Sequence, residues 1–174
     1  MTEAARAPTD AQLRDLYDYF AGIAVENYNR HGAVGPSLFA VRLGGETLLE
    51  SVVEMEDLMR ALQESDAMRA KFAPVVQALL DERGVIREDF RRKGLPLPDL
   101  AVHIVESLVA GGADGEVRDV VTIGLHSAAG TVLGHCLIEG DAPRQARPGT
   151  LDPVAGRRDA ASLFPDTSPA TGLH

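Results

Sequence analysis

The chain is poor in cysteine and in aromatic residues. Among its 174 residues there is one cysteine and no tryptophan, and aromatic residues make up only 5%. A single cysteine excludes an internal disulfide framework and favours a reducing, cytoplasmic setting. The hydrophobic content of 45% is ordinary for a globular protein, so the core is expected to be mainly aliphatic.

Long apolar runs are also missing. No stretch approaches the ~18 apolar residues that a membrane helix needs. Residues 1–12 lack the basic region followed by an apolar run that marks a signal peptide. Phosphate-binding, dinucleotide-binding and calcium-binding loop motifs are absent as well. We therefore expect no contact with a membrane and predict no cofactor.

Basic charge is scarce, since the net charge is −9. Residues 141–174 carry four acidic residues and four arginines, so the whole excess of negative charge falls on residues 1–140. Such an acidic body disfavours direct binding to the DNA backbone, which requires a basic face. The excess fits either simple solubility or an acidic inhibitor that mimics nucleic acid.

The patterns that are present indicate an α+β fold. Thr9 and Gln12 form a capping box ahead of a helix that ends near Gly32. Residues 1–8, before the cap, are predicted to be flexible. The apolar residues of the helix recur at steps of three and four, namely Leu13, Leu16, Tyr17, Phe20, Ile23, Ala24 and Tyr28.

Two β-hairpins are predicted, at residues 37–55 and 117–139. Gly44 and Gly45 suit a two-residue turn in the first, and the small residues 127–130 form the turn of the second. The register of the second hairpin stays open, because a three-residue loop and a four-residue loop differ by one step. One register buries Val132, Cys136 and Ile138 with Val121, Ile123 and Leu125, and the other buries Leu133, His135 and Leu137 instead.

Helices are expected at residues 56–84, in two segments, and at residues 86–93. Residues 99–110 are ambiguous, because their valines favour a strand but a polar stripe favours a helix, which is our prediction. A helix would place four polar residues on one face: Asp99, His103, Glu106 and Ser107. Such a face would be a small acid–base group or, more simply, a polar surface.

Residues 141–174 hold five of the ten prolines and few large apolar residues, so we predict a flexible tail. Its apolar spot, Leu163 and Phe164, could dock on a partner or on the body of the protein. The predicted organisation is thus a single domain at residues 9–140 followed by this tail. The domain would hold an antiparallel sheet of about four strands, with helices mainly on one face.

The second hairpin contains residue types that bind metals or act in catalysis: His126, His135, Cys136 and Glu139. Their spacing contains no CxxC or HxxxH pair, which structural metal sites often use. Cys136, within an apolar strand, is explained as a small buried hydrophobe. A metal-assisted hydrolase using His126 and His135 is therefore an alternative and not our leading hypothesis.

A basic cluster follows the acidic stretch 46–66, and its members are Arg83, Arg87, Arg91, Arg92 and Lys93. This cluster is either a solvated helix surface or a site that would bind an anion or the acidic strip of a protein partner. The partner could be a second copy, because both charged patches lie on one chain. With no catalytic motif found, the leading hypothesis is a small soluble interaction or regulatory protein that is not an enzyme.

Overall fold

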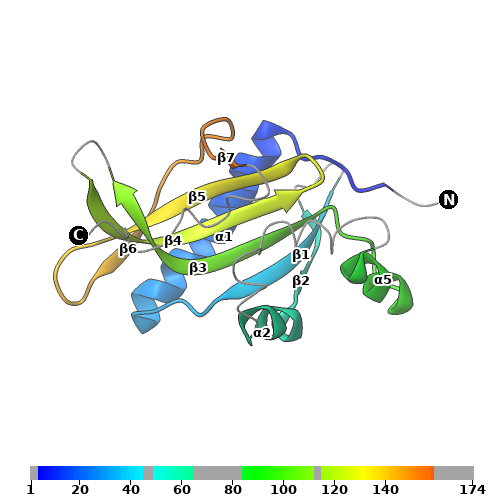
Figure 1. Ribbon diagram of the computed structural model, residues 1–174, viewed down its shortest axis with the longest axis horizontal. Coiled ribbons are helices and arrows are strands. Elements are labelled where there is room, and N and C mark those ends of the chain that lie inside the picture. The colour runs from blue at the N-terminus through cyan, green and yellow to red at the C-terminus, as the bar shows by residue number, and fades with distance from the viewer. Residues whose placement is uncertain (1–3, 45–48, 65–83, 112–114, 159–174) are drawn as a thin grey trace, which may run out of the picture.

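The structure is a computed structural model that describes residues 4–44, 49–64, 84–111 and 115–158. Ten elements follow one another along this part of the chain (Figure 1). They are α1 (Asp10–His31), β1 (Ser37–Leu43), β2 (Leu49–Glu54), α2 (Glu56–Glu64), α5 (Val85–Arg92), β3 (Leu100–Gly111), β4 (Glu116–Ser127), β5 (Gly130–Glu139), β6 (Gln145–Pro148) and β7 (Arg157–Arg158). Among the described residues, no helix is long and apolar enough to cross a membrane.

The strands form one curled antiparallel sheet with the order β2-β1-β3-β4-β5-β6. The short β7 also pairs with β5, next to β6. The class predicted from the sequence, α+β with an antiparallel sheet built around two hairpins, is confirmed. The expected four strands understate the sheet, because β3 and β6 fall in segments that were predicted to be a helix and a tail.

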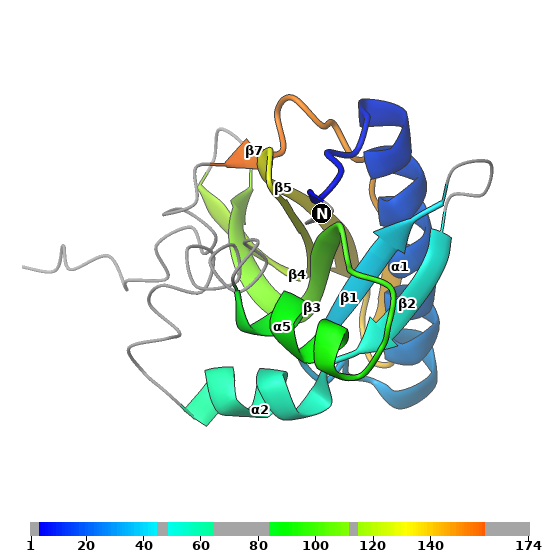
Figure 2. The same ribbon diagram turned by 90° about the vertical axis from the view of Figure 1, so that its right-hand side faces the viewer.

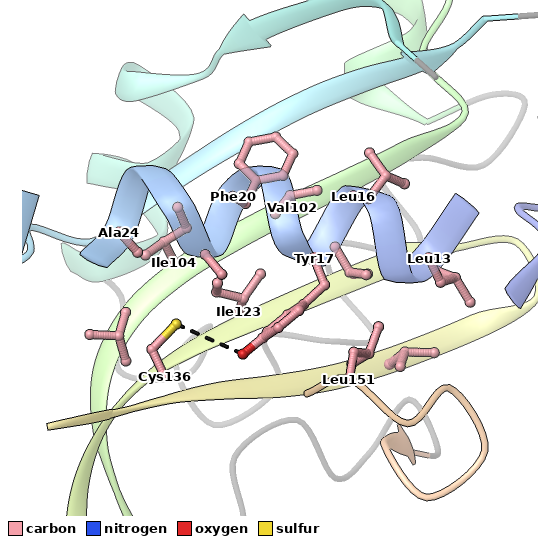
Figure 3. Close-up of a cluster of buried hydrophobic side chains, with 14 of the residues drawn as sticks. Leu13, Leu16, Tyr17, Phe20, Ala24, Val102, Ile104, Ile123, Cys136 and Leu151 are labelled. Carbon is pink, nitrogen blue, oxygen red and sulfur yellow. Dashed lines mark hydrogen bonds between the residues drawn. The ribbon is translucent and has the colours of Figure 1, made fainter. Parts of the chain in front are cut away.

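The first face of the sheet, as we call the face that α1 covers, holds the larger core (Figure 3). The helix begins at the predicted capping box, in which Thr9 Oγ1 accepts from the Gln12 amide and Gln12 Oε1 accepts from the Thr9 amide. It ends at Gly32, whose φ of 75° suits glycine. The apolar stripe of α1 packs on strand residues that include Val102, Ile104, Ile123 and Cys136.

The opposite, second face carries a smaller core formed with α2 and α5 (Figure 2). Met59 and Leu62 of α2 and Ile86 and Phe90 of α5 cluster with strand residues such as Leu133. The expectation that helices lie mainly on one face is therefore wrong. Of the predicted helical stretch 56–84, residues 65–83 lie outside the described residues.

The segment 99–110 corrects our helix prediction, because it forms the central strand β3. Its backbone pairs with β4 over all twelve residues, from Leu100↔Ser127 to Gly111↔Glu116, and with β1 on the other side from Leu100 to Ile104. Two ladders of backbone hydrogen bonds outweigh the weak helical periodicity, and the β-branched residues suit a buried strand. As a result, His103 and Ser107 share one face of the sheet, whereas Glu106 points to the other.

The register of the β4–β5 hairpin is now fixed. His126 pairs with Thr131 and Ser127 pairs with Gly130, so the first of the two predicted registers is the one observed. Val132 and Cys136 join the first face, and His135 lies on the second face opposite Thr122. In the other hairpin, Leu43 pairs with Leu49, so its connection is longer than the predicted two-residue turn.

Both ends of the domain are more firmly attached than predicted. The Arg6 amide donates to Asp99 Oδ1 over 2.8 Å, so the segment before α1 is anchored to the sheet. After β5, β6 pairs with it, and Ala146 exchanges two hydrogen bonds with the Asn29 side chain of α1. Leu151 is buried in the first-face core. Residues 145–158 thus belong to the folded body, and residues 159–174 lie outside the described residues.

We predict that a chain ending at residue 141 is less stable than a chain ending at residue 158. The shorter chain loses the burial of Leu151 and the hydrogen bonds of Ala146 and Gly149. The expected difference in the free energy of unfolding is about 3–5 kcal/mol. Urea unfolding of the two truncated chains measures it, and equal midpoints would contradict the packing of this segment.

Candidate functional site

Six polar side chains lie together on the second face of the three central strands. Residues that pair directly across an antiparallel sheet share a face, so the register places them on it. They are His103 and Ser107 from β3, Thr122 and His126 from β4, and Thr131 and His135 from β5. We call this set the polar ladder.

A buried histidine pair forms one half of the polar ladder. His103 Nδ1 lies 2.6 Å from His126 Nε2, and the two rings stack with centroids 4.9 Å apart. His126 Nδ1 in turn lies 3.0 Å from Thr131 Oγ1. One ring nitrogen of the pair must donate and the other accept, so this short contact requires at least one neutral imidazole.

The sheet leaves room for the ring of His103 at Gly124. A Cβ atom at Gly124 would lie 2.0 Å from His103 Cε1, which is far inside van der Waals contact. Gly124 is the residue directly opposite His103 on β4. The ring therefore lies flat over the backbone of its neighbouring strand, in the position from which it reaches His126.

Burial keeps both imidazoles neutral. Desolvation lowers the pKa of His103 to about 4, and it holds the pKa of His126 well below the ordinary value, helped by the charge that His103 would carry. A base whose pKa lies this low takes up a proton poorly near neutral pH. The pair is thus better suited to a structural hydrogen bond than to proton transfer.

The other half of the polar ladder is a chain of hydroxyl groups that ends on an imidazole. Ser107 Oγ hydrogen-bonds with Thr122 Oγ1, which lies 3.1 Å from His135 Nδ1. Thr122 is buried, whereas Ser107 and His135 are half-buried. His103 therefore contacts His126, and Ser107 is linked to His135 through Thr122. The strand places Glu106 on the other face, whereas a helix would have placed it on the same face as His103 and Ser107.

The four residues predicted as metal or catalytic candidates do not converge. His126 and His135 lie on the second face, in separate halves of the polar ladder. Cys136 lies on the first face, where its Sγ is 3.8 Å from the hydroxyl of Tyr17 (Figure 3). Glu139 is exposed at the end of β5, with Arg147 Nε 4.0 Å from its carboxylate. Within the described ranges, no three His, Cys, Asp or Glu residues are grouped so that they could hold a metal ion.

Cys136 is a buried thiol, as the apolar strand indicated. Desolvation raises its pKa, and it also raises the pKa of Tyr17. The Tyr17 hydroxyl donates to the carbonyl oxygen of His135 over 2.7 Å and accepts from the Gly149 amide over 3.1 Å. It thereby ties α1 to β5 and to the segment after β6.

The predicted basic cluster is divided by the fold. Arg83 lies outside the described residues. Arg87 is only 1% exposed, and its Nη1 donates to the carbonyl oxygen of Pro98 over 2.9 Å, so it does not form part of a contact surface. Arg92 and Lys93 remain at the surface, and both bond to Asp89. These two hydrogen bonds lower the pKa of the Asp89 carboxyl.

A cleft of about 690 Å³ lies beside these surface charges. Its walls come from the end of β2, the first turn of α2, and α5 with the turn that follows it. Six apolar side chains line it: Val53, Met55, Leu58, Ile86, Phe90 and Leu95. Seven charged side chains line it as well: Glu54, Glu56, Asp57, Glu88, Asp89, Arg92 and Lys93. We call this site the β2–α2–α5 cleft.

The sequence indicated parts of this cleft but not the cleft itself. The acidic stretch 46–66 and the basic residues Arg92 and Lys93 were both identified, although nothing placed them across one groove. The histidine pair was missed because His103 was assigned to a helix. The alternation of His103 and Ser107 with Val102, Ile104 and their neighbours was the available signal, since a period of two indicates a strand.

No protein family, curated protein or solved structure matches this chain.

We predict that Gly124→Ala destabilises the protein by about 2 kcal/mol, because the added methyl group must displace the His103 ring from its neighbour. Gly22→Ala is the matched control, because a Cβ atom there would meet nothing within 4 Å. In the interior of α1 that change should stabilise the protein by up to about 1 kcal/mol. Equal effects of the two variants on urea unfolding would show that His103 does not occupy the recess.

We predict that the neutral histidine pair makes the fold sensitive to acid. His103 binds a proton near pH 6.5 when unfolded but only near 4 when folded, so its contribution is complete above pH 6.5 and is lost as pH falls toward 4. At about pH 5 the loss from His103 alone is about 2 kcal/mol relative to about pH 7. Urea unfolding at the two pH values measures this loss, and an imidazole signal of His103 that titrates near 6.5 in the folded protein would contradict it.

Proposed function

We propose that this protein is a non-enzymatic interaction protein that holds a segment of a partner protein in the β2–α2–α5 cleft. The observation that carries the proposal is the composition of the cleft wall, where partly exposed apolar side chains lie as a floor between two charged rims. A cleft of this kind allows a partner to bury apolar side chains and to be oriented by polar contacts at the edge.

The floor offers a place for an apolar side chain. Ile86 and Phe90 are almost fully buried in the second-face core, and they form the rigid base of the cleft. Leu95, in the turn after α5, is 37% exposed and lies at the edge of the cleft. Covering such a half-exposed leucine with a partner would contribute about 1 kcal/mol or more to binding.

The polar ladder supports the non-enzymatic part of the proposal. Its imidazole pair is buried and neutral at physiological pH, and Cys136 and Glu139 lie elsewhere. An acidic mimic of nucleic acid is supported less well, because the acidic residues at this end of the molecule are interleaved with arginines. Arg60 contacts Glu56 and Asp57, and Arg42 contacts Glu50. We also infer a reducing, cytoplasmic setting from the single buried thiol.

The proposal predicts that a partner can be captured from the cleft. A photo-crosslinking residue at position 95 should form an adduct with a partner protein in cells that produce this protein. The same residue at position 19 should form none, because Tyr19 is 47% exposed on α1, on the other face of the sheet. Mass spectrometry of the adduct identifies the partner and the peptide that lies in the cleft.

Leu95→Ser and Leu108→Ser form a matched pair for this test. Both leucines are exposed, at 37% and 52%, but Leu108 lies on β3 away from the cleft. Leu95→Ser should weaken binding of the identified partner about tenfold, which corresponds to about 1.4 kcal/mol of lost apolar contact. Leu108→Ser should leave the affinity unchanged. Equal loss in both variants, or no adduct at position 95, would contradict the proposed site.

A further inference from the structure

The two rims of the β2–α2–α5 cleft differ in net charge, since one is negative and the other is balanced. On the rim formed by the end of β2 and the start of α2, three carboxylates line the cleft (Glu54, Glu56 and Asp57). Arg60, which pairs with Glu56 and Asp57, lies outside this lining. On the α5 rim, two carboxylates (Glu88 and Asp89) are balanced by two basic side chains (Arg92 and Lys93).

The carboxylates of the negative rim are the groups that can attract the positive charge of a ligand. Arg60 lies 3.1 Å from Glu56 and 3.5 Å from Asp57, so one cation is shared by two carboxylates. The side chain of Asp57 is 99% exposed. No ion pair involves Glu54 among the residues that the structure describes. On the other rim, Arg92 and Lys93 are already bonded to Asp89 of their own helix.

We propose, building on the function proposed above, that the occupant of the cleft is a short cationic amphipathic segment of a partner protein. Its apolar residue occupies the floor between Leu58, Phe90 and Leu95, and its flanking lysine or arginine side chains lie against Glu54 and Asp57. The net charge of −9 on the whole chain adds a long-range attraction for such a segment. The attraction guides the encounter, whereas the apolar floor holds the bound segment.

The negative charge of the rim also favours this cationic occupant over the apolar spot in the protein's own tail. Leu163 and Phe164 lie between Asp159 and Asp166, and residues 159–174 contain no lysine or arginine. That segment would bring negative charge to a negative rim. Like charges at close range disfavour such docking, so a segment from another protein is the better match.

The test uses three synthetic peptides and the full chain. One peptide has a central Leu-Phe pair flanked by lysines, the second has the same pair flanked by glutamates, and the third has Ser-Ser flanked by lysines. Fluorescence polarisation measures their affinities. The first peptide should bind most tightly, and its affinity should fall when the ionic strength rises from about 0.05 M to about 0.5 M, because exposed charges are then screened.

Two charge-reversal variants locate the attraction. The variant Glu54→Lys with Asp57→Lys should weaken binding of the lysine-flanked peptide roughly tenfold, since two exposed attractions become repulsions. The variant Asp15→Lys with Asp18→Lys changes the net charge equally but on the exposed side of α1, and it should keep the affinity within about twofold. Circular dichroism checks that both variants are folded.

The outcomes separate this inference from the proposed function. Preference for the glutamate-flanked peptide, or equal weakening in the two charge-reversal variants, overturns the cationic occupant. The same holds if the adduct at position 95 is a second copy of this chain or a partner segment without basic residues. In those cases a loss of binding in Leu95→Ser still supports the cleft as an interaction site. Absence of an adduct at position 95 removes both.

Discussion

The register between β4 and β5 is the constraint on which most of this structure depends. With His126 opposite Thr131 and Thr122 opposite His135, the polar side chains of both strands fall on the second face. The same step places Val121, Ile123, Leu125 and Cys136 under α1. A shift by one residue would turn His135 into the core beneath the helix and move Cys136 to the second face. Burying an imidazole without partners there would cost several kcal/mol, so the register is strongly determined.

Two glycines allow an aromatic or imidazole ring to pack closely against each face of the central sheet. Gly124 makes room for the His103 ring on the second face, where a Cβ atom would lie 2.0 Å from Cε1. Gly134 makes room for Tyr17 on the first face, where a Cβ atom would lie 2.4 Å from the aromatic ring. Each ring then reaches a hydrogen-bonding partner beyond the glycine. The small residues therefore allow polar rings to lie close to the backbone without opening the sheet.

The cleft and the polar ladder differ in how far their ionisable side chains are buried. In the buried His103–His126 pair of the polar ladder, desolvation keeps the imidazoles neutral, and they contribute to the packing of the sheet. At the cleft, the carboxylates and basic groups lie near the surface, where charged groups can act over a distance. We expect a partner to interact with the charged groups at the cleft. This contrast is why we propose the interaction site at α5 and the first turn of α2, and not at the histidines.

The sequence by itself determined the features that depend on neighbours along the chain. The α1 helix with its caps at Thr9 and Gly32, and the existence of both hairpins, follow from local hydrogen bonding and from side-chain periodicity. Only the tertiary structure decided that residues 100–111 form a strand, because pairing with β1 and β4 outweighs their local helical periodicity. It also decided the pairing of His103 with His126, the burial of Arg87 and the meeting of β2, α2 and α5. Each of these depends on contacts between residues far apart in sequence, which no local pattern encodes.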